Sequence, residues 1–249
     1  MLKTYRADLH LHTVLSPCGE LDQSPGAVAE AAGRAGLDLV AITDHNTAEN
    51  AGAYARRLGK NGIAALPGLE VTTAEEVHLL ALFDDLESAL TLQSAVYQRL
   101  DGVNDPDAFG MQVVVNENED VLGFNEHLLI GATTWTLQQA SERIHRLGGL
   151  AFACHVDREG FGLIGQLGFV PPGLALDALE ISPRTSMARA RADIPDCARF
   201  PLVRSSDAHR PEDVGKGWTA FLLEAPTTDE IRKALREEDG RRVLGYEPP

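Results

Sequence analysis

Cysteine is scarce in this sequence, and its spacing gives it no evident structural role. The 249 residues include three cysteines, Cys18, Cys154 and Cys197, with no CxxC spacing among them. An odd, widely spaced set of this kind excludes a disulfide framework and a zinc knuckle. A chain of this length buries roughly 70–75% of its unfolded surface, so it needs neither of them to fold.

Long apolar segments are absent as well. No stretch of the sequence approaches the ~20 apolar residues that a membrane-spanning helix requires. The first residues, MLKTYRADLHLH, place charges and histidines where a signal peptide would have its apolar region. We therefore expect a cytoplasmic protein with no membrane partner.

Basic and aromatic residues are also in short supply. The chain has 22 Lys and Arg against 37 Asp and Glu, a formal net charge of −15, and only 6% aromatic residues. Such a protein is a poor electrostatic platform for duplex DNA, and single-strand grooves normally combine basic tracks with aromatic side chains. The composition disfavours a duplex nucleic acid partner. It leaves room for a small anionic ligand or a short single strand.

Short apolar segments alternate with helical patterns along the chain. The pattern predicts strands at 5–9, 37–43, 63–68, 149–155, 175–182, 202–209 and 218–223, and two more within 70–83, EVTT and VHLLALF. It predicts helices that begin at Ser24 and at Thr227, and others at 47–60, 86–101, 136–147 and 185–193. This alternation favours an α/β fold with a mostly parallel sheet, either open or closed into a barrel.

Residues 102–135 have no regular period and mix turn-forming residues with acids. We expect them to form a loop-rich insertion near the functional site, within a single domain of residues 1–249.

Several predicted strands have a histidine at or just after their C-terminal end. These histidines are His10, His12, His45, His155 and His209. In an α/β barrel the C-terminal ends of all the strands surround one mouth, where active sites lie. An open sheet would gather only the ends beside its switch point. The distribution therefore favours a barrel.

The spacing of these residues suits metal binding. Side chains two apart on a strand point the same way, so His10 and His12 can hold one ion, and Asp207 and His209 repeat that spacing. Imidazole suits transition metals, and carboxylates such as Glu70 can bridge two ions. A single histidine on an apolar strand is more often a core residue, but the combined set predicts two or three ions. By contrast, His127 and His145 are expected at the surface.

Six motifs, DLHLHT, AITDHN, GLEVT, EVHLLAL, ACHVD and SSDAH, resemble in this order those of the PHP (polymerase and histidinol phosphatase) family. The resemblance covers nearly the whole chain. It implies a distorted (β/α)7 TIM-like barrel whose metal site lies at the C-terminal ends of the strands. It also implies two or three divalent metal ions (Mn, Zn or Fe) and hydrolysis of phosphoesters.

The resemblance also implies a role for each metal ligand. One ion would be held by His10, His12 and Asp207; Glu70 would bridge to a second, completed by His78 and His155; and a third would use His45 and His209. Asp44 is expected to orient His45, the ligand histidine that directly follows it. Cys18 stands where the family has Asp or His as the remaining ligand of the third ion. A thiolate suits zinc or iron and is a poor ligand for manganese, so Cys18 is either a ligand of a softer or weaker third ion or merely a small buried residue.

The function that follows is a metal-dependent phosphoesterase that hydrolyses a small phosphomonoester, nucleotide-like or other, by a metal-activated water. We assign catalytic roles to Glu70, Asp207 and His209. Arg158 and Arg184 follow predicted strands and are expected to bind the anionic phosphate ester.

Other functions remain open. The segments FNEHLLIGATTW and HVDREGFG resemble stand-alone PHP proteins, whose relatives dephosphorylate nucleoside 3′,5′-bisphosphates and trim short RNA from its 5′ end. A 5′–3′ exonuclease on short single-stranded RNA or DNA is therefore an alternative, as is a non-catalytic domain. A metal-dependent amidohydrolase is a further alternative. Such enzymes usually bridge their metals with a carboxylated lysine, and Lys3, Lys60, Lys216 and Lys233 do not end a predicted strand in the middle of the barrel.

Overall fold

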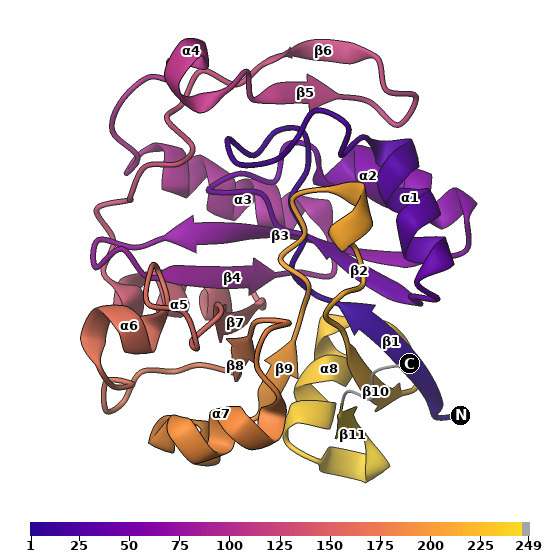
Figure 1. The fold of residues 1–249 in the computed structure, drawn as a ribbon, viewed down its shortest axis with the longest axis vertical. Coiled ribbons are helices and arrows are strands. Elements are labelled where there is room, and N and C mark those ends of the chain that lie inside the picture. Colours follow the sequence, from indigo (N-terminus) through magenta and orange to yellow (C-terminus); the bar gives the residue numbers. More distant parts are fainter. Residues whose placement is uncertain (246–249) are drawn as a thin grey trace.

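A computed structural model describes residues 1–245 and shows an α/β fold with a nearly closed, barrel-shaped sheet (Figure 1). The last four positions of the expected domain lie outside the described residues. The strands are β1 (Lys3–Asp8), β2 (Leu39–Ile42), β3 (Ala64–Thr72), β4 (His78–Leu82), β5 (Val113–Val115), β6 (Val121–Phe124), β7 (Leu150–Ala153), β8 (Ala178–Ile181), β9 (Leu202–Arg204), β10 (Thr219–Leu223) and β11 (Arg242–Gly245). The α-helices are α1 (Pro25–Arg34), α2 (Ala51–Lys60), α3 (Leu86–Tyr97), α4 (Pro106–Phe109), α5 (Leu137–Arg146), α6 (Leu163–Leu167), α7 (Met187–Asp193) and α8 (Thr228–Leu235).

The main sheet has nine strands in the order β11-β10-β1-β2-β3-β4-β7-β8-β9. Its far edge returns to β1 just beyond the two strand ends, where Leu11 and Ala208 form a parallel bridge. The His12 amide donates to the Ala208 carbonyl, and the Asp207 amide donates to the His10 carbonyl, both at 3.0 Å. Strands β1, β2, β3, β4, β7, β8 and β9 therefore form the predicted TIM-like barrel. Strand β10 pairs antiparallel with residues 3–7 of β1, and β11 pairs antiparallel with β10.

Strand β4 runs against both of its neighbours, β3 and β7. This reversal places the beginning of β4, where His78 lies, at the mouth that the other strands reach with their ends. The prediction of separate strands at 63–68 and at EVTT was wrong, because β3 runs unbroken from Ala64 to Thr72, whereas the strand predicted at VHLLALF corresponds to β4. Glu70 thus lies inside a buried strand and is held by pairing on both sides.

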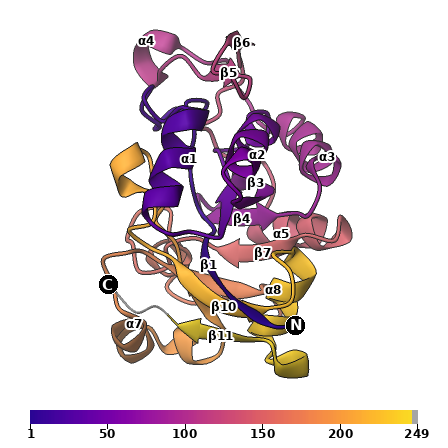
Figure 2. The ribbon, with the colours of Figure 1, turned by 90° about the vertical axis from the view of Figure 1, so that its right-hand side faces the viewer.

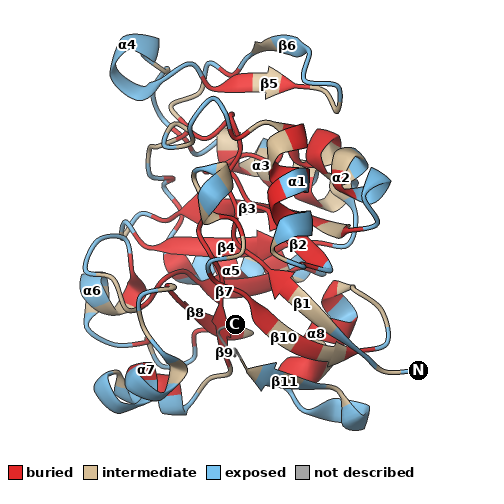
Figure 3. Ribbon diagram, turned by 45° about the vertical axis from the view of Figure 1, so that its right-hand side comes forward, coloured by how far each residue is buried: buried red, intermediate tan, exposed pale blue. Residues whose placement is uncertain are grey.

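Alternating side chains divide the apolar core into two main clusters. One cluster joins residues from β1, β2, β3, β4, β7, β8 and β9 with residues of α8, and it includes Leu39, Leu66, Leu80 and Phe152. The other lies between the strands and the surrounding helices α1, α2, α3 and α5. Figure 3 shows buried strands at the centre and exposed surfaces on α4, α6 and α7. The first cluster fills the barrel below the mouth, so the mouth has a rigid floor.

The loop after β2 is longer than the sequence pattern indicated. The helix predicted at 47–60 begins only at Ala51, because the Ala48 amide and the Thr47 hydroxyl donate to Gln93 Oε1 on α3. Residues 43–50 are therefore free to curve across the barrel mouth. His45 in this loop forms an isolated parallel bridge with Glu70.

Residues 102–135 contain helix α4 and the two-stranded sheet of β5 and β6, and their other residues form turns and irregular chain. They lie at one end of the molecule, beyond α1 and α2 (Figure 2). The Val113 amide donates to the Val14 carbonyl, and Asn46 Nδ2 donates to the carbonyls of Leu129 and Gly131. The segment is thus anchored to the loops that follow β1 and β2.

Within residues 1–245, none of the helices is long and apolar enough to cross a membrane.

Gly217 provides a test of how the barrel closes. A Cβ at this position would lie 2.1 Å from the Ser205 carbonyl oxygen, in the segment that leads to Asp207. We expect Gly217→Ala to lower the free energy of unfolding by about 1–3 kcal/mol, the usual cost of overpacking. Gly59→Ala is the control, because nothing lies within 4 Å of its Cβ and α2 would lose a helical glycine. It should stabilise by up to ~1 kcal/mol. Equal urea midpoints for wild type and Gly217→Ala would contradict this prediction.

Candidate metal centre

The predicted ligands converge on the barrel mouth from six separate places in the chain. Buried or half-buried, they come from the end of β1, the loop after β2, the middle of β3, the start of β4 and the segments after β7 and β9: His10, His12, His45, Glu70, His78, His155, Asp207 and His209. The structure thus brings together all the histidine and carboxylate ligands that the sequence predicted.

Glu70 lies at the centre of this group, with both carboxylate oxygens close to imidazole nitrogens. The distances from Oε1 are 2.8 Å to His78 Nδ1, 3.3 Å to His10 Nε2 and 3.3 Å to His155 Nε2. Those from Oε2 are 3.0 Å to His45 Nδ1 and 3.3 Å to His12 Nε2. A carboxylate with imidazoles around both oxygens has the arrangement needed to bridge two ions.

The donor atoms fit metal ions better than they fit one another. Four of them are buried and make no hydrogen bond, although they lie within 3.0 Å of one another across the His–Glu70 contacts: His45 Nδ1, His78 Nδ1 and both oxygens of Glu70. A buried polar atom without a partner is costly, and metal coordination would satisfy it. The side chains form four groups with mutually close ligand atoms: His10-His12-Glu70, His45-Glu70-His78, Glu70-Cys154-His155 and His12-Cys18-His45-His209. These overlapping groups suit a site for more than one ion.

The charges within the centre are strongly coupled. Burial alone would raise the pKa of Glu70, but His78, His10 and His45 outweigh it and hold that pKa well below its usual range. Burial would likewise lower the pKa of His12, yet hydrogen bonds to Asp207 and Glu70 raise it to about 9. Two carboxylates thus retain protons on nearby imidazoles. A divalent ion would displace these protons, which couples metal binding to proton release.

Two further imidazoles are held neutral. Burial, reinforced by the neighbouring His12, lowers the pKa of His209 to about 4. Burial also holds the pKa of His45 well below its ordinary value. His209 Nδ1 donates to the Asp207 carbonyl at 2.7 Å, which leaves Nε2 as the available ligand atom. Neutral imidazole is the form that binds metals.

A second layer of carboxylates orients the ligands. His10 Nδ1 lies 3.1 and 3.0 Å from the two oxygens of Glu180, a fully buried residue of β8. Asp44 accepts from the Ser16 hydroxyl, and His12 Nδ1 lies 2.8 Å from the same Ser16 oxygen. Asp44 therefore supports His12 through Ser16, and not the adjacent His45 that it was expected to orient. The sequence analysis missed Glu180, although a single acid inside the apolar strand ALEIS was a signal for it.

Two ligands have backbone conformations that are uncommon for residues other than glycine. His155 has φ of 30° and Asp207 has φ of 51°. Such conformations persist when the surrounding structure determines them, and they concentrate at functional sites. Here the Asp207 amide donates to the His10 carbonyl and the Val156 amide donates to the Glu180 carbonyl. Pairing with neighbouring strands therefore fixes both ligands at sharp turns.

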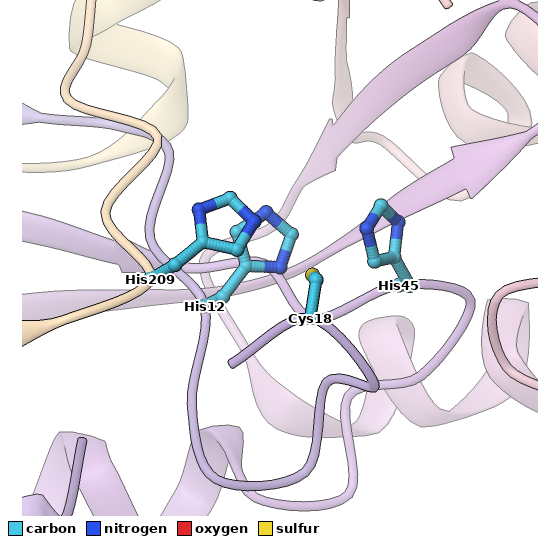
Figure 4. A group of neighbouring side chains, drawn as sticks. All are labelled: His12, Cys18, His45 and His209. Carbon is cyan, nitrogen blue, oxygen red and sulfur yellow. The ribbon is translucent and has the colours of Figure 1, made fainter. Parts of the chain in front are cut away.

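Cys18 lies on the loop after β1, beside His12, His45 and His209 (Figure 4). Its residue surface is exposed, but its Sγ lies within 4.8 Å of the ligand nitrogens of these histidines. Cys18 is therefore not a small buried residue.

A cavity of about 530 Å³ adjoins the metal centre. It is lined by Arg158, Pro183, Arg184, Ser206, Asp207, His209, Asp213 and Lys216. Arg158 donates to Asp207 Oδ2 at 2.6 Å, and Lys216 pairs with Asp213. The two arginines expected to bind phosphate therefore line one cavity beside two of the ligands. Lys216 joins them, and its position in a loop after Asp207 gave no sequence signal for this role.

The other two histidines lie outside the centre. His127 stacks on Tyr97, with ring centroids 3.8 Å apart, and His145 Nε2 is 2.7 Å from Asp177 Oδ2. Both are partly exposed and lie at the surface, as expected. Neither belongs to a candidate ligand group.

A barrel whose mouth gathers histidines around a bridging carboxylate is the architecture of metal-dependent hydrolases. Comparison with known families agrees. The sequence model of the family described as PHP domain matches residues 8–155, and the family model described as PHP-associated matches residues 198–239. The chain belongs to the PHP family.

Individual relatives are more distant. The uncharacterized protein MJ1587 from Methanocaldococcus jannaschii is 32% identical over 101 residues, which cover 36% of this chain and 58% of that protein. The lesion-specific endonuclease PfuEndoQ from Pyrococcus furiosus superimposes with a TM-score of 0.73 and 21% identity, over 99% of this chain and 60% of that one. A candidate metal-dependent phosphoesterase from Bifidobacterium adolescentis superimposes with a TM-score of 0.60 and 18% identity, over 93% of this chain and 96% of that one. The chain thus spans about three fifths of the first two relatives, and the two structures support the fold alone.

Glu180 provides a test of the second layer. Glu180→Gln keeps the size of the side chain and one acceptor for His10 Nδ1, but it removes the charge that orients this ligand and makes it more basic. We expect metal affinity to fall by roughly 10–100-fold, measured by competition with a chromophoric chelator. The control is Glu142→Gln on the exposed side of α5, where Glu142 accepts only from Gln138. If both variants bound metal like the wild type, Glu180 would have no positioning role.

Proposed function

We propose that this protein is a metal-dependent phosphoesterase that hydrolyses a small phosphomonoester. The observation that carries the proposal is the cavity in which Arg158, Arg184 and Lys216 lie beside Asp207 and His209. Three cations around a metal centre favour a substrate with a concentrated negative charge, and guanidinium groups match the geometry of phosphate oxygens. The centre supplies the hydrolytic chemistry, and the cavity supplies recognition.

The proposed ligands fall into sets that would hold different ions. His10, His12 and Asp207 would hold one ion, while Glu70 would share a second with His78 and His155. Bound ions would neutralise phosphoryl oxygens and lower the pKa of a water molecule. Glu70 places its two oxygens toward different ligand groups.

His209 and Arg158 both line the cavity, and each has a different proposed role there. His209 is neutral around pH 7, and with Nδ1 engaged its Nε2 can accept a proton or bind a third ion. Arg158 donates a hydrogen bond to Asp207, so its guanidinium lies next to a proposed metal ligand, where it could also contact a bound phosphate.

The observations favour this function over an amidohydrolase. One relative of similar fold is an amidohydrolase from Chromobacterium violaceum. Enzymes of that type usually bridge their ions with a carboxylated lysine. In the described part of this chain Glu70 belongs to three of the four candidate ligand groups and would take the bridging role, whereas the side chain of Lys216 pairs with Asp213 at the cavity.

The charge of the chain and of the cavity also favours a small substrate over duplex DNA. Endonuclease Q, a relative of similar fold, was solved with a 27-mer duplex carrying an abasic lesion, but this chain covers only 59% of it. A net charge of −15 opposes a long polyanion, whereas three cations in one cavity can bind one or two phosphates. A 5′–3′ exonuclease acting on short single strands remains the second candidate. In either case we propose that residues 102–135 are an insertion bordering the site within a single domain.

Metal removal combined with a substrate panel tests the proposal. Chelation should abolish hydrolysis, and manganese, zinc or iron(II) added in turn should restore it. The panel comprises an aryl phosphomonoester, a nucleoside 3′,5′-bisphosphate, a 5′-phosphorylated trinucleotide, a lesion-bearing duplex and an N-acyl amide. We expect inorganic phosphate from the first two. Cleavage confined to the trinucleotide would favour the exonuclease, and cleavage confined to the duplex or the amide would refute the proposal.

The role of the cavity is tested by Arg184→Ala and Lys216→Ala. Neither side chain contacts a metal ligand in the hydrogen bonds or ion pairs of residues 1–245, so metal content should not change. Loss of one charged contact to phosphate should lower kcat/KM by roughly tenfold, mainly through KM. Arg146→Ala, an exposed arginine of α5, is the control. If KM and kcat were unaltered in both cavity variants, the assignment would be wrong.

A further inference from the structure

The four candidate ligand groups differ in chemistry. Three of them contain Glu70 and therefore offer a hard oxygen donor. The fourth, His12-Cys18-His45-His209, offers three imidazoles and one sulfur, with ligand atoms within 4.8 Å of one another. Figure 4 shows the Cys18 sulfur among these rings, with His12 and His209 on one side and His45 on the other. This group has no carboxylate among its members.

We propose that Cys18 is the fourth ligand of a third metal position, and that its sulfur makes this position selective for zinc or iron(II) over manganese and magnesium. The inference rests on the proposed metal centre and specifies the chemistry of one of its ions. An S1N3 donor set suits a tetrahedral, thiophilic ion, whereas manganese and magnesium prefer oxygen ligands. The same mouth therefore combines a carboxylate-bridged pair with a softer third position.

The histidines around Cys18 support a ligand role independently of the sulfur. His45 Nδ1 is buried without a hydrogen-bond partner, and the His45 side chain is only 5% exposed. His209 Nδ1 is engaged with the Asp207 carbonyl, so Nε2 is its free donor. The rings of His12 and His209 stack with centroids 4.3 Å apart. Two imidazoles are thus held beside the sulfur, and each has a ring nitrogen that makes no hydrogen bond.

Binding at this position would exchange a proton for a metal ion. When the sulfur–metal bond forms, the S–H bond breaks and the proton leaves to solvent, as is usual for thiolate sites.

One rival thiol lies nearby. Cys154 is fully buried and belongs to the group with Glu70 and His155. Cys197 is also buried but belongs to none of the four groups. Cys18 is the only one of the three with an exposed residue surface, so substitution there should be tolerated, and a soluble reagent should reach its sulfur first.

Cobalt(II) substitution distinguishes the three cysteines. Metal-free full-length protein loaded with cobalt(II) should show a thiolate-to-cobalt charge-transfer band in the near ultraviolet. We expect Cys18→Ser to lose this band, and Cys154→Ser and Cys197→Ser to retain it. A band that survived in Cys18→Ser, or that disappeared only in Cys154→Ser, would overturn the proposal, as would a wild-type protein with no band.

Two further readouts measure selectivity. Zinc should slow alkylation of Cys18 by iodoacetamide by about tenfold or more, while manganese and magnesium leave its rate unchanged. Cys18→Ser should bind about one zinc ion fewer per chain, and Cys18→Asp should regain an ion but prefer manganese. Equal protection by manganese and zinc would refute the selectivity.

These readouts do not depend on turnover. If the spectroscopic and protection results appear but no phosphomonoester is hydrolysed, the proposed function fails and the sulfur-ligated position stands. If phosphomonoesters are hydrolysed but neither the charge-transfer band nor the protection from alkylation appears, the sulfur-ligated position fails and the proposed function stands.

Discussion

A buried carboxylate surrounded by imidazoles is the constraint around which the rest of the structure is arranged. Glu70 is 1% exposed and lies within 3.3 Å of nitrogens from five histidines. A buried charge persists only if it is paired or bound to a metal. Its partners come from distant parts of the chain, so the barrel must close for the site to exist. The reversed strand β4 and the bridge between Leu11 and Ala208 are the two features that complete the circle.

The layer behind the ligands explains how so many imidazoles keep defined orientations. A metal ligand needs one ring nitrogen fixed so that the other points at the ion. Glu180 does this for His10, Ser16 and Asp44 do it for His12, and a backbone carbonyl does it for His209. These partners lie on separate elements, so the metal centre and the closure of the barrel are coupled in energy.

Sequence periodicity was sufficient for the features that depend on local geometry. His10 and His12, or Asp207 and His209, lie two residues apart near a strand end, and such pairs can be recognised without a structure. The direction of β4 could not be recognised, because an apolar strand carries no signal of its orientation. Glu180 reaches His10 across 170 positions of sequence, and only the strand order determines that contact. Lys216 reaches the cavity through an irregular loop, where no period applies.

Net charge is a poor guide to this site because the charges are separated in space. The total of −15 includes Glu70, Glu180 and Asp207, which are buried among imidazoles at the mouth. Arg158 pairs with Asp207 at 2.6 Å, so in the proposed function phosphate recognition and metal binding would share one carboxylate. An ion that took up the charge of Asp207 would weaken its hold on Arg158 and make the guanidinium available to an incoming phosphate. Local neutralisation, not the overall charge, therefore decides whether an anion can bind here.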